Sequence, residues 1–352
     1  MPFFKWLKKA RIRNNSDTMN AIPEGVTEDL ITSFIVDAGW GDAHYEALGA
    51  DMGLRRYARL TRDGETSLFM DMSRSGYEAD LNAFVKIAKH FREHNIRAPE
   101  IYALDLNKGL SIIEDFGEES FGAARANGIA DKEIYQRATD VLVKIRKSAQ
   151  TNVLELNDYE GTLIRKRLSQ FVDYYMPLTA GRLTTQSDHD EFQSVMKEVE
   201  KTLPPCPVSI CHADYHLENL MWCPDHAQGY GIIDFQDAFW GPQPYDLLNL
   251  LEDARQTVPN DIKQSMKAQY CEGMSTEEVE AFDAWYVYMS SHFHCRVIGL
   301  FIKFAREHGG TEFLAHIPRL QNYITENLEN PLLAPLKDFM ECHKISFDCV
   351  ID

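Results

Sequence analysis

The chain has 352 residues, a formal net charge of -18 and a sequence pI near 5.1. This length predicts two domains that can bury substantial cores, and the hydrophobic content of 44% is ordinary for a globular protein. The acidic balance argues against nucleic acid as a partner, because a phosphate backbone requires a basic surface. Seven cysteines without regular spacing indicate reduced thiols in a cytoplasmic protein.

Residues 1–20 are predicted to form a flexible basic arm. Residues 1–13, MPFFKWLKKARIR, mix lysine and arginine with aromatic side chains and contain no apolar core long enough for a secretory signal. Such a segment can touch an anionic membrane surface or a partner, but the polar residues that follow favour a disordered arm. The most apolar helical stretch, residues 285–305, is interrupted by histidine and charged side chains, so we predict no transmembrane segment.

Residues 21–117 are predicted to form a small N-terminal lobe built on strands, which would bind the nucleotide. Apolar residues alternate at strand spacing or recur at helical spacing, and turn residues separate these stretches. The expected elements are a helix over 27–39, strands within 45–60 and 66–71, an amphipathic helix over 78–94 and a hairpin over 99–115.

Two loops of this lobe are candidates for nucleotide contacts. Gly49 and Gly53 resemble a loop that folds over phosphates with its backbone N–H groups, although an ordinary hairpin is the simpler interpretation of these residues alone. Glu114 and Asp115 end the second hairpin. A hinge between lobes at this point would let backbone groups meet an adenine edge, and a plain turn is the alternative.

Residues 118–352 are predicted to form the larger C-terminal lobe, which would be catalytic and would bind the acceptor. Helical spacing dominates here, with helices expected over 131–148, 159–175, 277–305 and 320–327. A strand-rich first part and a helical second part predict an α+β fold with two lobes.

The residues that carry chemistry are concentrated between 209 and 253. His212-x-Asp214 is followed by Asn219, and a hairpin pattern then ends at Asp234. Phosphoryl transfer needs this order, because one carboxylate orients the hydroxyl nucleophile while another carboxylate and a neutral oxygen hold the magnesium that bridges the phosphates. We predict Asp214 as the base, Asn219 and Asp234 as magnesium ligands, and His212 as the structural anchor of the loop.

Two departures from protein kinases narrow this prediction. Ala213 stands directly before the predicted base, where eukaryotic protein kinases carry an arginine, which favours a small-molecule kinase. The strand lysine that usually pairs with the nucleotide phosphates is missing, since residues 10–85 contain no lysine. Phosphoryl transfer still needs fixed positive charge near the phosphates, and Arg55, Arg56 and Arg59 are the candidates. The alternative is that these arginines form a solvated strand face.

The central motif, with Ile232-Ile-Asp-Phe235 and Gly241-Pro-x-x-Tyr-Asp-Leu247, resembles the aminoglycoside phosphotransferase and choline kinase superfamily. Within it, further motifs are similar to the anomeric N-acetylmuramate/N-acetylglucosamine kinases of bacterial cell-wall recycling: Met70-Asp71, Glu114-Asp-Phe-Gly117, Asp234-Phe-Gln-Asp-Ala238 and Ile317-Pro-Arg319. In that family the strand Met-Asp also lacks the lysine. The residues after Met-Asp and the stretch 292–296 depart from the family pattern, so the preferred sugar stays open.

The resemblance spans residues 27–340. It implies a protein-kinase-like bilobal fold whose small lobe has an antiparallel sheet. It also implies that ATP and magnesium are used to phosphorylate the C1 hydroxyl of an N-acetyl amino sugar during peptidoglycan recycling. A small-molecule sugar would then be the partner, and the oligomeric state is not predicted.

Two other functions stay open. A kinase of a cationic substrate, an aminoglycoside or choline, would need acidic or aromatic groups around the acceptor, and Trp240, Trp285, Tyr286 and Tyr288 are candidates for them. A nucleotide-binding pseudokinase that acts as a scaffold would account for the missing lysine, but the intact motif opposes it.

Overall fold

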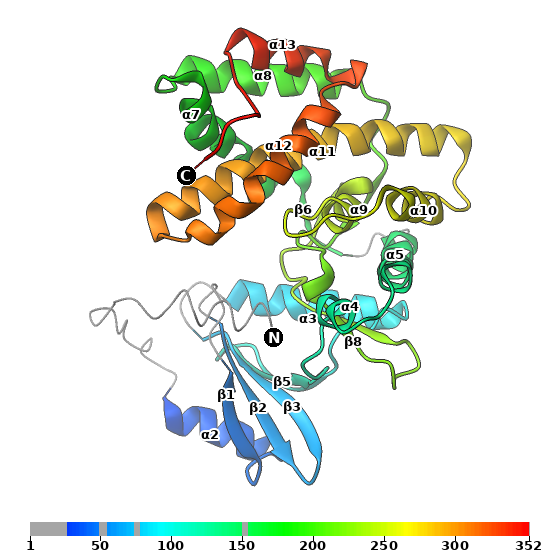
Figure 1. Cartoon of the computed structure of the whole chain (residues 1–352). Coiled ribbons are helices and arrows are strands. Elements are labelled where there is room, and N and C mark those ends of the chain that lie inside the picture. Colours follow the sequence, from blue (N-terminus) through cyan, green and yellow to red (C-terminus); the bar gives the residue numbers. More distant parts are fainter. Residues whose placement is uncertain (1–26, 49–54, 74–77, 150–153, 352) are drawn as a thin grey trace. The chain divides into compact units, whose positions relative to one another are not determined.

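The computed structural model describes residues 27–48, 55–73, 78–149 and 154–351 (Figure 1). The predicted basic arm and the loop of Gly49 and Gly53 lie outside the described residues. The chain divides into two compact units. Met1–Ile134, Asn152–Leu154 and Leu217–Asp237 belong to the first unit, and the rest of the chain belongs to the second. The predicted domain boundaries at residues 20 and 117 stay predictions.

The first unit is built on a five-stranded antiparallel sheet with the strand order β1-β2-β3-β5-β4. Its strands are β1 (His44–Leu48), β2 (Arg56–Arg62), β3 (Glu65–Asp71), β4 (Ile101–Asp105) and β5 (Leu110–Glu114). The strands predicted within 45–60 and 66–71 and the hairpin predicted over 99–115 are therefore present. Alternation of buried and half-buried residues, as in β2, places one face of the sheet on a core.

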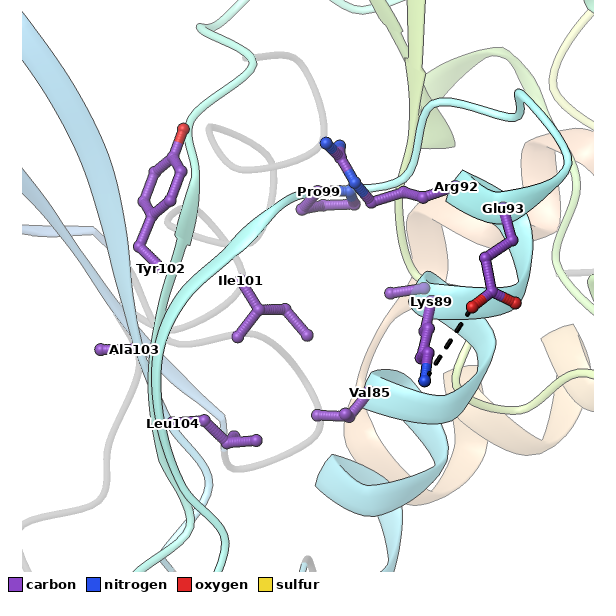
Figure 2. A pocket seen from close by; sticks show the side chains of 10 residues that line it. Val85, Lys89, Arg92, Glu93, Pro99, Ile101, Tyr102, Ala103 and Leu104 are labelled. Carbon is purple, nitrogen blue, oxygen red and sulfur yellow. Dashed lines mark ion pairs between the residues drawn. The ribbon is translucent and has the colours of Figure 1, made fainter.

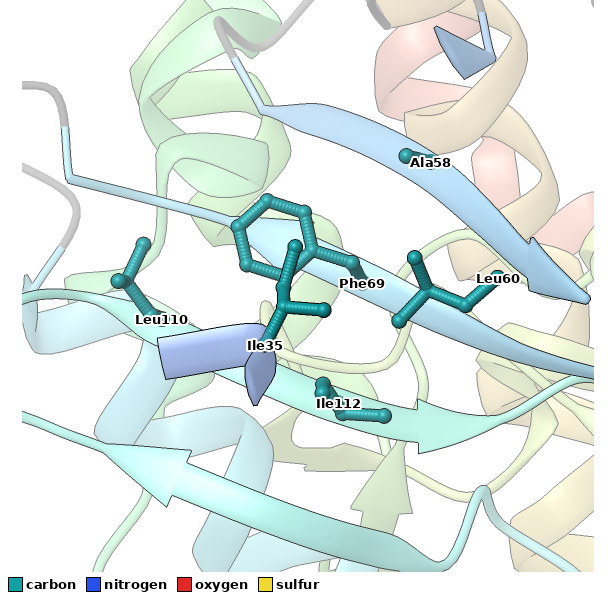
Figure 3. Close-up of a cluster of buried hydrophobic side chains, with 6 residues drawn as sticks. All are labelled: Ile35, Ala58, Leu60, Phe69, Leu110 and Ile112. Atoms are coloured by element: carbon teal, nitrogen blue, oxygen red, sulfur yellow. The ribbon is translucent and has the colours of Figure 1, made fainter. Parts of the chain in front are cut away.

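Helix α2 (Glu28–Asp37) packs on this sheet through Ile35 (Figure 3). Thr27 caps the helix, because its side chain accepts a hydrogen bond from the N–H of Leu30 at 3.3 Å. Around Ile35, the buried side chains come from three strands: Ala58, Leu60, Phe69, Leu110 and Ile112. The burial of these apolar residues fixes the register of β2, β3 and β5.

Helix α3 (Glu78–Glu93) and strand β4 line a cavity of about 580 Å³ (Figure 2). Its lining is mostly apolar, with Lys89, Arg92 and Glu93 at the helix side. No residue that lines it is a predicted site residue. On another face of α3, Phe84 stacks on Phe235 with ring centroids 5.1 Å apart, and Phe91 meets the same ring edge-on.

A short hairpin completes the first unit. It consists of β8 (Leu220–Trp222) and β9 (Tyr230–Ile232), after a 3₁₀ turn over Leu217–Asn219. The N–H of Trp222 donates to the carbonyl of Glu119 at 2.7 Å, just before α4 (Phe121–Ala126). Gly231 is required at its position, because a Cβ there would lie 2.4 Å from the ring of Phe116.

The second unit is largely helical. A small sheet, β6 (Asn157–Asp158), β10 (Phe239–Pro242) and β7 (Val208–Cys211), carries the chain toward the predicted catalytic loop. The main helices are α5 (Asp131–Ser148), α8 (Gln186–Thr202), α9 (Pro244–Leu251), α10 (Asn260–Tyr270), α11 (Thr276–His308), α12 (Ile317–Asn327) and α13 (Ala334–Cys342). The sheet of the first unit and these helices confirm the α+β prediction.

Helix α11 has 33 residues and is mostly buried along its middle. Ser275 and Glu278 form a capping box at its start, and Gly309, with φ of 70°, ends it. The stretch 285–305 therefore lies within α11 and is largely buried. Among the helices of the described residues, none combines the length and the apolar character that crossing a membrane requires.

The single helix predicted over 159–175 is wrong. The structure has a 3₁₀ turn (Tyr159–Gly161), α6 (Leu163–Lys166), a second 3₁₀ turn (Arg167–Ser169), a π-helical turn (Phe171–Tyr175) and then α7 (Met176–Ala180). Tertiary packing competes with local helix formation here, because the chain passes so close to α11 that a Cβ on Gly299 would lie 2.4 Å from the Gln170 backbone.

Candidate active site

The two predicted metal ligands lie together at one end of the β8–β9 hairpin. Asn219 ends the 3₁₀ turn before β8, and Asp234 follows shortly after β9. The N–H of Ile233 donates to the carbonyl of Asn219 at 3.1 Å, which joins the two arms of the hairpin. Asp234 has a φ of 65°, a left-handed conformation that costs energy for a residue with a Cβ and is concentrated at functional sites.

The donor set suits a hard cation. The Asp234 carboxylate and the Asn219 side-chain amide both offer oxygen, the ligand that magnesium prefers. The Asp234 side chain is 35% exposed, and its Oδ1 lies 3.1 Å from Arg55 Nη1. The same oxygen accepts a hydrogen bond from Gln236 Nε2 at 2.9 Å. Residues present on this hairpin are therefore able to hold a magnesium ion that keeps some of its waters.

Each arginine predicted to contact phosphates has a carboxylate partner within the first unit. Arg55 pairs with Asp234, as just described. Arg56 on β2 forms an ion pair with Asp71, which stands opposite to it on β3. Asp71 is 1% exposed and belongs to the Met70-Asp71 pair, the strand in which the resembling kinases also lack the lysine. The guanidinium of Arg56 thus lies beside Asp71 of the neighbouring strand.

Arg59 lies farther along β2 and contacts the predicted hinge. Its Nε lies 2.6 Å from Asp115 Oδ2, and its Nη1 lies 2.6 Å from Glu118 Oε1. Asp115 also accepts the N–H of Gly117 at 2.9 Å. The Arg59 side chain therefore braces the segment after β5 in this structure.

The Glu114 carboxylate is also held by an arginine and a backbone N–H group. Arg97 Nη2 donates to its Oε1 at 2.6 Å, and the N–H of Glu100 donates to Oε2 at 3.2 Å. The Arg97 guanidinium also lies 4.5 Å from the centre of the Phe116 ring. The side chains of Glu114 and Asp115 thus bind neighbouring groups of the first unit, and their contact with the nucleotide stays a prediction.

In the second unit, the predicted catalytic loop follows β7 and is anchored by Asp246 on α9. The N–H groups of His212 and Ala213 donate to the two oxygens of Asp246 at 2.5 and 3.3 Å. His212 is buried, and its Nδ1 accepts the N–H of Asp214 at 3.4 Å. Ala213 has a φ of 83°, so the residue before the predicted base is also in a strained left-handed conformation.

Burial governs the ionisation of Asp246. Burial raises the pKa of Asp246 to about 7, and the charge of Asp214 adds to the rise, while the N–H groups of His212 and Ala213 act in the opposite direction. The carboxyl that holds the loop therefore changes its charge near neutral pH.

This shift predicts a pH-dependent stability. Between an ordinary aspartate pKa of 3.8 and about 7, the folded state binds the Asp246 proton and the unfolded state does not. The free energy of unfolding should therefore fall as pH rises through this window, by at most about 4 kcal/mol. Asp246→Asn should remove that contribution. Urea unfolding of wild type and Asp246→Asn at pH 5 and pH 7 tests this prediction. An equal change in the free energy of unfolding between the two pH values in both proteins would contradict it.

Asp214 itself is 63% exposed and has a buried partner that the motif did not predict. His216 Nε2 lies 3.3 Å from Asp214 Oδ2. Desolvation opposes ionisation of Asp214, but the charges of His216, Arg255 and His212 outweigh it and hold the pKa of Asp214 below its usual range. Asp214 is therefore ionised at neutral pH and presents acceptor oxygens to solvent.

Sequence reasoning missed three residues around Asp214. Arg255 Nη1 approaches His216 Nε2 at 3.5 Å, and Arg255 Nε donates to Asp253 Oδ1 at 2.7 Å. The only local indication in the sequence that His216 lies near Asp214 is that it follows Asp214 by two residues. Arg255 and Asp253 lie after α9, and no spacing rule connects them to the loop.

Comparison with known proteins assigns the sequence of this chain to a family. The sequence model of the Phosphotransferase enzyme family matches residues 37–288, well over half of the chain. The chain belongs to the Phosphotransferase enzyme family. It is a kinase, since curated relatives over most of its length are named as kinases.

Two such relatives are N-acetylmuramate/N-acetylglucosamine kinases. The relative from Caulobacter vibrioides is 27% identical over 343 residues, which cover 88% of this chain and 94% of that protein. The relative from Neisseria meningitidis serogroup B is 28% identical over 288 residues, which cover 78% of this chain and 83% of that protein. The predicted membership in the aminoglycoside phosphotransferase and choline kinase superfamily is therefore confirmed.

A solved structure confirms the kinase-like fold. The choline kinase LicA from Streptococcus pneumoniae is similar to this chain with a TM-score of 0.54 at 13% identity, covering 84% of this chain and 99% of LicA. LicA has also been solved in complex with AMP. At this identity the similarity carries the fold and no substrate.

Proposed function

We propose that the protein transfers the γ-phosphoryl group of ATP to the C1 hydroxyl of N-acetylmuramate, N-acetylglucosamine or both, in peptidoglycan recycling. The observation that carries this proposal is the similarity to N-acetylmuramate/N-acetylglucosamine kinases over 88% of the chain. The nucleotide is inferred from the family and from the AMP complex of LicA. The spacing of Asp214, Asn219 and Asp234 supports a competent enzyme rather than a scaffold.

Asp214 acts on the acceptor hydroxyl in this mechanism. Its carboxylate accepts a hydrogen bond from the C1 hydroxyl of the sugar. The hydroxyl oxygen then forms a bond to the γ-phosphorus, while the bond between that phosphorus and the ADP oxygen breaks. The hydroxyl proton passes to Asp214 or to solvent. An anomeric hydroxyl is more acidic than an ordinary alcohol, but a carboxylate with a lowered pKa is a weak base, so orientation of the hydroxyl is the main role of Asp214.

Asn219 and Asp234 would hold the magnesium ion through their side-chain oxygens. The bound ion supplies charge neutralisation on the nucleotide phosphates. His212 contributes by anchoring the loop that carries Asp214, because its ring accepts the Asp214 N–H. These roles follow from the residue types and their spacing in the motif.

Arg56 is our candidate for the positive charge that replaces the strand lysine. Its guanidinium meets Asp71 on β3, and Arg56 itself is 37% exposed, so it is accessible to a phosphate. Arg55 lies beside Asp234 and would contribute next to the metal. Arg59 is bound to Asp115 and Glu118, which favours a bracing role for it.

Replacing Arg56 with Ala should raise the KM for ATP or lower kcat, with a combined effect of about 10- to 100-fold on kcat/KM, because a fixed charge near the phosphates is lost. Arg62→Ala is the matched control, since Arg62 ends the same strand and pairs with Asp42 at 3.3 Å. Initial rates at varied ATP measure both parameters. Equal kinetics for Arg56→Ala and wild type would exclude Arg56 from this role.

The proposed acceptor is tested with a panel of substrates. ATP consumption is measured with N-acetylmuramate, N-acetylglucosamine, choline and kanamycin, with and without magnesium. We expect magnesium-dependent turnover with an amino sugar and a product that is acid-labile, as a C1 phosphate is. Turnover with only choline or kanamycin, or an acid-stable sugar phosphate, would contradict the proposal.

The structure does not favour a cationic acceptor. Three of the four aromatic residues that kept this alternative open, Trp285, Tyr286 and Tyr288, are buried along α11. Tyr286 donates to Glu252, and Tyr288 donates to Glu200. Aromatic side chains that pack in a helical core do not offer an accessible face to a quaternary or primary amine.

A further inference from the structure

We propose that His216 is a positioning residue for the phosphoryl transfer, and that Asp253 keeps the positive charge of Arg255 beside His216 and Asp214. This inference rests on the proposed function of Asp214 as the base. The set Asp253, Arg255, His216 and Asp214, which we call the base-holding chain, lies entirely in the second unit.

The first link restrains the base. Asp214 is 63% exposed and lies on a loop, so its carboxylate would otherwise sample several rotamers. His216 is 4% exposed and cannot move freely. We assign the Nε2 proton to the 3.3 Å contact with Asp214, because an ionised carboxylate only accepts hydrogen bonds. One oxygen of Asp214 is thereby held by a buried side chain, which restrains the carboxylate that is proposed to accept the hydroxyl proton.

The second link places a fixed positive charge beside the histidine and the base, and this charge helps to lower the pKa of Asp214. Arg255 Nη1 lies 3.5 Å from His216 Nε2, so a permanent positive charge stands beside the ring. Both the side-chain Nε and the backbone N–H of Arg255 donate to Asp253 Oδ1, at 2.7 and 2.9 Å. Asp253 is buried, so this pair is held more firmly than an exposed ion pair.

The segment that carries Asp253 and Arg255 is itself clamped. Glu252 accepts hydrogen bonds from Tyr286 at 3.0 Å and from Ser290 at 2.8 Å, and it pairs with His294 at 2.7 Å, all from α11. From α12, Arg319 donates to the carbonyl of Ala254 and to Thr257 Oγ1. His294 and Arg319 therefore hold the segment 252–257, which carries Asp253 and Arg255.

Other titratable groups lie near the base-holding chain, and their charges and those of its members influence one another's pKa values. His212 and Asp246 act on Asp214 from the catalytic loop and α9, and His316, just before α12, feels the charges of Arg255 and Asp253. A change in the pH profile is therefore assigned to the base-holding chain only when variants of two of its members agree.

The test compares His216→Gln and Arg255→Gln with wild type, using whichever acceptor the wild-type enzyme phosphorylates. We expect kcat to fall about 10- to 100-fold with the KM for ATP within about twofold, because only the base loses its orientation. The acid limb of the kcat profile should also move to higher pH. His216 and Arg255 hold the pKa of Asp214 down, so removing either lets Asp214 become protonated at higher pH.

His189→Gln is the matched control, because His189 Nε2 also lies about 3 Å from an aspartate, Asp173, in the same unit. It should leave kcat and the pH profile unchanged. Thermal melting checks that the variants fold, and Asp253→Asn provides a second route to the same loss if His216→Gln does not fold. Unchanged kcat in folded His216→Gln and Arg255→Gln, or an unshifted acid limb in both, would overturn the proposal.

Failure of the proposed function gives a different result. If wild type phosphorylates no acceptor of the panel, the acceptor assignment fails. The inference is then tested by carbon-13 NMR titration of the Asp214 carboxyl, assigned with Asp214→Asn. A higher Asp214 pKa in both His216→Gln and Arg255→Gln supports the base-holding chain, and an unchanged pKa overturns it.

Discussion

Asp214→Asn is expected to lower kcat by about 100- to 10,000-fold, the range that a positioned general base contributes. An amide presents N–H donors where the carboxylate presented an acceptor, so the C1 hydroxyl loses the group that orients it and takes up its proton. The KM for ATP should stay near the wild-type value, because Asp214 acts on the acceptor. Steady-state rates at saturating ATP and amino sugar measure the effect.

The loss in Asp214→Asn is judged against a control variant. Asp261→Asn removes an exposed carboxylate in the first turn of α10 of the same unit and should leave kcat unchanged. Full activity of Asp214→Asn would remove the base from the mechanism. A loss that appears only in the KM for ATP would instead move Asp214 from the acceptor to the nucleotide.

Asp234→Ala is expected to produce a loss of similar size, at least about 100-fold in kcat/KM, because the carboxylate that would neutralise the metal and its phosphates is removed. The magnesium concentration for half-maximal activity should also rise. Since Arg55 lies 3.1 Å from this carboxylate, the variant would also leave Arg55 without that partner.

Two measurements distinguish the loss of metal binding from a folding defect. Manganese binding in the presence of a non-hydrolysable ATP analogue, followed by electron paramagnetic resonance, should weaken in Asp234→Ala and stay normal in Asp225→Asn. Asp225 is an exposed carboxylate between β8 and β9 on the same hairpin. Normal manganese binding in Asp234→Ala would contradict the assignment of Asp234 as a ligand.

The local elements that carry the motif could be predicted from sequence. Alternating apolar residues and turn residues indicated the hairpins of the sheet, and the short apolar runs after Asn219 and before Asp234 indicated β8 and β9. Because hairpin pairing joins residues that are close in sequence, the prediction also brought Asn219 and Asp234 to the same end. The backbone bond between Ile233 and Asn219 agrees with it.

The partners of the charged residues were not predictable in this way. Arg56 meets Asp71, Arg59 meets Asp115, and Asp246 binds the backbone at residues 212 and 213. These pairs are separated by 15 to 56 residues. Periodicity reports which face of an element is apolar, but it carries no information about which distant charge will lie opposite. The sequence therefore showed that the strand lysine is missing, but it did not show that Arg56 pairs with Asp71.

By itself, then, the sequence determined the family, the strand and helix content of each part, and the residue types of the motif, because these depend on local spacing. Tertiary structure alone decided that the segment 159–175 breaks into short turns, that Asp246 is buried with a raised pKa, and that His216 connects Asp214 to Arg255. Each of these depends on how closely remote segments pack and how much water they exclude, and that free energy is set by the folded chain as a whole.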